Sequence, residues 1–176
     1  GDHRVGGVVG NNLGVVRSCN NRSGVNTTAE ENQVKLSDIS FDTITGSESV
    51  STVTDIGGIA GTSSGVIRQS KNRGNVGYQH MGYNVGGIAG VTSGYLLNNT
   101  NSGTIYGRKD VGGICGFSSG VIIGCTNWGG VGFEHVGYNI GGIAGRSAGW
   151  LDGCVNTGSV NGRKDVGGIV GQLEPE

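Results

Sequence analysis

Apolar residues gather in short runs that recur along the chain, and each run opens with an aliphatic residue followed by two glycines. Six copies of this anchor are present, at residues 5–10, 56–61, 85–90, 111–116, 140–145 and 166–171. Successive glycine pairs are separated by 51, 29, 26, 29 and 26 residues. A repeat of this size is typical of proteins built from stacked units.

The positions between the anchors keep a common phase. A glycine follows each of the first five anchors by four residues, and a short apolar run comes after it. Two further columns complete the repeat, one of asparagine and one of β-branched residues: Asn21, Asn72, Asn101, Asn127 and Asn156, then Val25, Val76, Ile105, Val131 and Val160. These pieces are too short and too β-branched for helices, and their alternation has the period of strands. Each repeat therefore predicts three short strands separated by glycine or asparagine turns.

One such repeat cannot bury its own apolar face, but it can do so when copies stack about 4.8 Å apart and pair in parallel. We therefore expect an all-β fold over residues 1–176: one β-solenoid domain, a right-handed parallel β-helix of six to seven coils. The anchor isoleucines would form one internal column: Ile59, Ile88, Ile114, Ile143 and Ile169. Because the pattern runs to both ends of the sequence, we expect the chain to be a segment of a longer array.

The repeat length alternates between 29 and 26 residues, and the difference lies in the turn that precedes each anchor. The longer repeats end in aromatic turns, at residues 77–84 and 132–139. The shorter repeats end in Gly-Arg-Lys-Asp, at residues 107–110 and 162–165. One edge of the solenoid is therefore predicted to carry aromatic and basic turns in alternation.

The first interval breaks this rule, because residues 26–54 contain no glycine anchor. The interval of 51 residues is close to the length of two repeats, so this segment is either a degenerate coil or a β-hairpin inserted at a corner. We favour the degenerate coil slightly.

Glycine suits the corners because it permits positive φ and close approach of the backbone. The asparagine column suits a turn in the left-handed region, and each amide can pair with the asparagine one layer away. Three cysteines, Cys19, Cys125 and Cys154, hold one repeat position, where other repeats carry Ser70 and Thr100. Together with Cys115, which replaces alanine or valine, they are predicted to be small buried residues. A disulfide between Cys125 and Cys154 is the less favoured alternative.

Composition narrows the classes of function. Twelve basic residues balance 13 acidic ones, which gives no electrostatic case for nucleic acid. The apolar runs are far shorter than the roughly 20 residues of a membrane span, so no membrane insertion is expected. The glycine turns lack the aspartate of calcium-binding nonapeptides, and no zinc-binding pattern occurs, so we expect neither a metal nor a cofactor. Asp110 and Asp165 are equivalent and hence disfavour catalysis, because a repeated constellation is more often a solvated turn.

The best candidates for recognition lie on the turn edge. The aromatic turns offer Tyr78, His80, Tyr83, Phe133, His135 and Tyr138, and the basic turns offer Arg108, Lys109, Arg163 and Lys164. Aromatic faces suit sugar rings or peptide side chains, and the basic groups suit carboxylates. The alternative is that the tyrosines pack over the glycine corners and the histidines cap the loops.

The repeats resemble the GLUG-motif family, most closely in residues 140–149 (Ile-Gly-Gly-Ile-Ala-Gly-Arg-Ser-Ala-Gly) and 154–160 (Cys-Val-Asn-Thr-Gly-Ser-Val). The resemblance covers nearly the whole chain apart from about residues 26–54. It implies a non-catalytic module of a large bacterial surface or secreted protein, with adhesion and binding of a glycan or of a host or cell-wall protein as the expected role. A docking or spacer region of a secreted peptidase is the second possibility, and a polysaccharide-acting β-helix enzyme the third.

Overall fold

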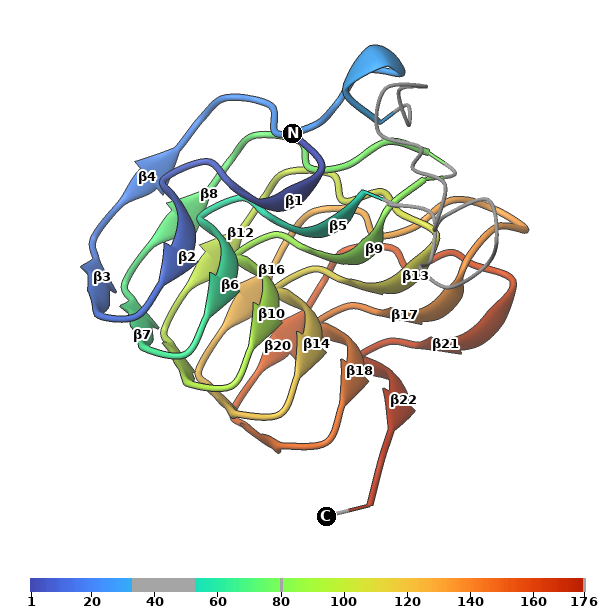
Figure 1. Ribbon diagram of the computed structural model, residues 1–176. Coiled ribbons are helices and arrows are strands. Elements are labelled where there is room, and N and C mark those ends of the chain that lie inside the picture. The colour runs from blue at the N-terminus through green and yellow to red at the C-terminus, as the bar shows by residue number, and fades with distance from the viewer. Residues whose placement is uncertain (33–52, 80, 176) are drawn as a thin grey trace, which may run out of the picture.

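The computed structural model describes residues 1–32, 53–79 and 81–175, and in them the chain winds into a β-solenoid (Figure 1). Two sheets of six strands and two of five run along it, and all their strands pair in parallel with the equivalent strand of the next coil. Val111, for example, pairs with Val85 on one side and with Ile140 on the other. The predicted all-β solenoid is confirmed.

The two longer sheets hold the anchors. The first sheet consists of β1 (His3–Gly6), β5 (Thr54–Gly57), β9 (Tyr83–Gly86), β13 (Lys109–Gly112), β17 (Tyr138–Gly141) and β21 (Lys164–Gly167). The second sheet consists of β2 (Val9–Asn12), β6 (Ala60–Ser63), β10 (Ala89–Thr92), β14 (Cys115–Ser118), β18 (Ala144–Ser147) and β22 (Val170–Leu173).

The two shorter sheets hold the apolar runs and the asparagines. The third sheet consists of β3 (Val15–Arg17), β7 (Val66–Arg68), β11 (Tyr95–Leu97), β15 (Val121–Ile123) and β19 (Trp150–Asp152). The fourth consists of β4 (Asn20–Asn21), β8 (Lys71–Asn72), β12 (Thr100–Asn101), β16 (Thr126–Asn127) and β20 (Val155–Asn156). A column of single bridging residues follows in each coil: Val25, Val76, Ile105, Val131 and Val160. One 3-10 helix, η1 (Glu30–Asn32), lies after the first coil.

Each coil thus has four strands and a bridging residue, where the sequence predicted three strands. The anchor itself is divided, since β9 ends at Gly86 and β10 begins at Ala89. With six strands in two sheets and five in the others, the solenoid has slightly fewer coils than the expected six to seven.

The first two anchors stack directly on each other, although 51 residues separate them in sequence. Val5 of β1 pairs with Ile56 of β5, and Val15 of β3 pairs with Val66 of β7. No layer lies between them, so our preference for a degenerate coil within residues 26–54 was wrong. The inserted hairpin concerns mainly residues 33–52, which lie outside the described residues.

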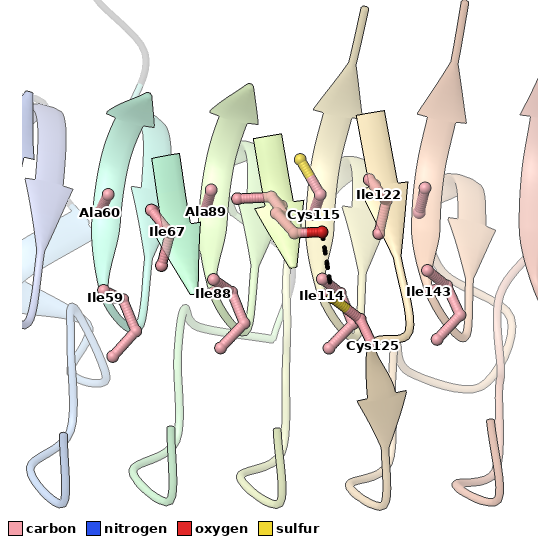
Figure 2. Packing of buried hydrophobic residues seen from close by; sticks show 12 residues of the cluster. Ile59, Ala60, Ile67, Ile88, Ala89, Ile114, Cys115, Ile122, Cys125 and Ile143 are labelled. Carbon is pink, nitrogen blue, oxygen red and sulfur yellow. Dashed lines mark hydrogen bonds between the residues drawn. The ribbon is translucent and has the colours of Figure 1, made fainter. Parts of the chain in front are cut away.

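The interior contains two apolar clusters. One is built from the anchor isoleucines, the second sheet and the third sheet, and Figure 2 shows Ile59, Ile88, Ile114 and Ile143 in a row with one residue from each coil. All four are fully buried, which confirms the predicted column for these coils, whereas Ile169 in the last coil is 40% exposed. The other cluster joins the first sheet to the bridging residues, for example Val85 to Val76 and Ile105.

An asparagine ladder runs along the solenoid where the two clusters meet. Nδ2 of Asn72 donates to Oδ1 of Asn101 over 2.8 Å, and Asn101 donates to Asn127 over the same distance. Asn101 Nδ2 also donates to the carbonyl of Gly103, and Asn101 Oδ1 accepts from the Gly103 N–H. Equivalent bonds extend the ladder to Asn21 and Asn156. The buried amides are therefore paired both within each coil and between coils, and the predicted ladder is confirmed.

The ladder asparagines do not have left-handed backbones, contrary to our expectation. Positive φ occurs instead in the column just before the anchors, where φ lies between 52° and 62°: Arg4, Asp55, Asn84, Asp110, Asn139 and Asp165. The ladder side chains point inward against the second glycine of each anchor. A Cβ atom at Gly87 would lie 2.4 Å from Cγ of Asn101. Glycine is needed there because the asparagine fills the space.

All four cysteines are free, so the alternative disulfide between Cys125 and Cys154 was wrong. Cys115 and Cys125 are buried, as predicted, whereas Cys19 and Cys154 are half-buried. The position equivalent to Cys125 in the neighbouring coil is held by Asn99, not by Thr100. The Asn99 N–H donates to Cys125 Sγ over 3.4 Å, and its Oδ1 accepts from the Ser70 N–H over 2.9 Å.

We expect Gly87→Ala to lower the free energy of unfolding by about 3 kcal/mol, because the added methyl group displaces the Asn101 amide and the neighbouring backbone. Gly168→Ala is the matched control, since it holds the same repeat position but a Cβ atom there meets nothing within 4 Å. The control should leave stability unchanged or raise it by up to about 1 kcal/mol. Urea denaturation of both variants decides, and equal losses would contradict this account of the glycine.

We also expect Cys115 and Cys125 to resist alkylation in the native protein. Burial raises the pKa of both thiols, that of Cys125 to about 12, so at about pH 8 very little reactive thiolate is present. Iodoacetamide treatment followed by peptide mass spectrometry should modify half-buried Cys19 first, and all cysteines after unfolding in urea. Rapid native modification of Cys125 would show that this part of the core opens readily.

Candidate functional site

A groove of about 550 Å³ lies over the first residues of the later strands of the first sheet. Its lining comprises Tyr83, Arg108, Lys109, Tyr138, Asn139, Lys164, Asp165 and Gln172. Gln172 comes from β22 of the second sheet, and the others come from the first sheet or the residue before it. Five residues proposed from the sequence therefore lie together here: Tyr83, Arg108, Lys109, Tyr138 and Lys164.

The strand register places four of these residues in one line, which we call the Tyr–Lys ladder: Tyr83, Lys109, Tyr138 and Lys164. Lys109 pairs with Tyr83 on one side and Tyr138 on the other, and Tyr138 pairs with Lys164. Neighbouring members are one strand apart, so equivalent members are separated by about 10 Å along the axis. The lysines are exposed and the tyrosines half-buried. The alternation of 29- and 26-residue repeats is thus converted into an alternation of ring and cation.

The left-handed column lies next to the ladder and is largely paired within itself. Nδ2 of Asn139 donates to Oδ1 of Asp110 over 2.7 Å, and Asn84 donates in the same way to Asp55 over 2.8 Å. Asp110 is 3% exposed and also accepts from Nε of Arg146 over 3.3 Å. Its carboxylate is therefore not presented to a ligand.

Arg146 fixes this arrangement from the second sheet. Its guanidinium lies 3.9 Å from the centre of the Phe117 ring, and its Nη1 donates to Oε1 of Glu174 over 2.9 Å. Burial lowers the pKa of Arg146, but hydrogen bonding to Glu174 and the charge of Asp110 outweigh this effect and raise it overall. Arg146 therefore remains charged and occupies two carboxylates beside the groove.

A second hollow of about 250 Å³ adjoins the groove, since Arg108 and Tyr138 line both. It adds His135 and Arg163 from the predicted set. Nε2 of His135 lies 3.6 Å from Oε1 of Glu134, and the two side chains are 89% and 78% exposed. Such an exposed pair contributes little to stability and leaves both side chains accessible.

The remaining aromatic candidates lie elsewhere. Tyr78 lines a hollow of about 150 Å³ with Tyr106, a residue that sequence reasoning missed. Phe133 packs edge-to-face on Tyr106, with ring centres 6.1 Å apart. The expected single aromatic row is therefore divided, and Phe133 packs within the turn edge. His80 lies outside the described residues.

Sequence reasoning also missed Asn139, Asp165 and Gln172 as lining residues. Asn139 and Asp165 could have been found from their place directly before the anchors. Tyr106 carried a signal as well, because it stands where two neighbouring repeats have Gly77 and Gly132. Gln172 carried none, since its part in the groove depends on how the second sheet meets the first.

Within residues 1–32, 53–79 and 81–175, no cluster of three or more histidine, cysteine, aspartate or glutamate side chains is placed to hold a metal ion. In the same part of the chain, no helix is long and apolar enough to cross a membrane. Comparison with family models, curated proteins and solved structures found no match.

Proposed function

We propose that this chain is a non-catalytic repeat module that binds an extended ligand along its Tyr–Lys ladder, and that the ligand is a glycan. The observation that carries the proposal is the alternation of half-buried tyrosines and exposed lysines in one groove. A tyrosine ring offers an apolar face to a sugar and keeps its hydroxyl for a hydrogen bond. Amide groups of Asn139 and Gln172 line the same groove and suit sugar hydroxyls.

The repetition of the groove favours a polymer over a small molecule. Equivalent residues recur at about 10 Å along the solenoid, so successive units of one chain can occupy equivalent positions. Each added contact is then intramolecular, which raises the overall affinity without any new type of contact. A folded host or cell-wall protein remains the weaker alternative partner.

A polysaccharide-acting enzyme is the less favoured function. Such enzymes use carboxylates that reach the scissile bond, either as acid and base or as nucleophile. Asp110 is held by Asn139 and Arg146 and is almost fully buried. Asp165 lines the groove, but no second carboxylate lines it among the described residues.

For the setting we propose a bacterial cell-surface or secreted protein in which the module extends and presents the groove. This part of the proposal rests on the resemblance to GLUG-motif repeats. A docking or spacer segment of a large secreted peptidase fits the same resemblance.

The test is a glycan array probed with the wild type, with the double variant Tyr83→Ala/Tyr138→Ala, and with Tyr95→Ala. Loss of each groove ring should cost roughly 1 kcal/mol, so the double variant should bind about 30-fold more weakly. Tyr95 is the matched control, because it is a 51% exposed tyrosine on the third sheet, outside the groove.

Circular dichroism should confirm that all three proteins keep their β structure. Equal binding by the wild type and the double variant would exclude the groove as the site. Depolymerisation of any glycan on the array would exclude the non-catalytic assignment.

A further inference from the structure

We infer that the ligand of the groove is an anionic polysaccharide with one carboxylate or sulfate per disaccharide, lying along the solenoid axis. This inference rests on the proposed function and specifies the ligand class. It follows from three properties of the groove: the spacing of its cations, its charge balance and the position of its rings.

The spacing of the cations comes from the register. Lys109 and Lys164 are separated by one intervening strand, β17, and hence by about 10 Å. Two rings of an extended sugar chain span a similar length. A charge on every second sugar would therefore meet a lysine each time, while the uncharged sugar between them lies over Tyr138.

The charge balance of the groove is strongly positive, although the whole chain is nearly neutral. Arg108, Lys109 and Lys164 line it against one carboxylate, that of Asp165. The nearby acids Asp110 and Glu174 are both taken by Arg146. Arg163 in the adjoining hollow adds a further cation. The arrangement attracts anions and has no evident use for a neutral glycan.

Cation spacing also argues against nucleic acid. A duplex presents a phosphate about every 3.4 Å along each strand, much more densely than these lysines are placed. An anion spaced by one disaccharide matches the ladder without unpaired charges on either side.

The experiment compares two oligosaccharides of equal length by titration calorimetry. A hyaluronan octasaccharide carries one carboxylate per disaccharide, and an N-acetylglucosamine octasaccharide is neutral; chondroitin sulfate of the same length tests whether sulfate is also accepted. The wild type should bind hyaluronan at least about tenfold more tightly than the neutral chain, the size of effect expected of charge-assisted contacts. Its affinity should fall as NaCl rises from about 0.05 to about 0.5 M.

Lys109→Gln/Lys164→Gln should reduce hyaluronan affinity about tenfold or more and remove most of the salt dependence. Lys71→Gln is the matched control, since Lys71 is an exposed lysine on the fourth sheet. It should bind as the wild type does.

The outcomes separate this inference from the proposed function. Tyrosine-dependent binding that is as tight for the neutral chain and unaffected by the lysine variant would overturn the anionic ligand and keep the glycan site. Failure of all three oligosaccharides to bind would overturn this inference, and with no tyrosine-dependent hit on the array it would overturn the proposed function too. Tighter, lysine-dependent binding of single-stranded DNA would replace the glycan by a nucleic acid.

Discussion

The structure depends on the hydrogen-bonded asparagine ladder that runs through its centre. Each ladder amide donates once to the next coil and once to its own turn, so a coil that slipped by one residue would leave buried amides unpaired. The second glycine of every anchor makes room for that amide. The ladder and the glycine pair together favour a single register, and the two apolar clusters on either side stabilise the stack.

A fixed register has a direct consequence for the surface. Whatever residue a repeat carries at a given position lies directly over its equivalent in the next coil, at a spacing set by strand pairing. Alternating turns therefore become alternating side chains along a line, as Tyr83, Lys109, Tyr138 and Lys164 show. Left-handed residues such as Asp110 and Asn139 pair with each other beside this line. The groove thus presents its cations while the adjacent acid is occupied.

Much of this could be predicted from the sequence, because a repeat exposes its own phase. The solenoid, the isoleucine column and the asparagine ladder all follow from positions such as Ile88 and Asn101. The strand number within a coil did not, because the bend at Gly87 is imposed by the asparagine on the opposite wall. The groove was predicted in part: its tyrosines and lysines were found, whereas Gln172 enters from another sheet. The place of residues 26–54 was misjudged, because interval length alone does not distinguish an insertion from a coil.

The account makes the groove a ruler whose divisions are two strands long, and a length series tests this most directly. Hyaluronan oligosaccharides of two, four, six and eight sugars would be titrated into the wild-type protein. Affinity should rise by about tenfold or more once the chain is long enough to reach both Lys109 and Lys164, and should change little beyond that length. A disaccharide that binds as tightly as the octasaccharide would contradict the account.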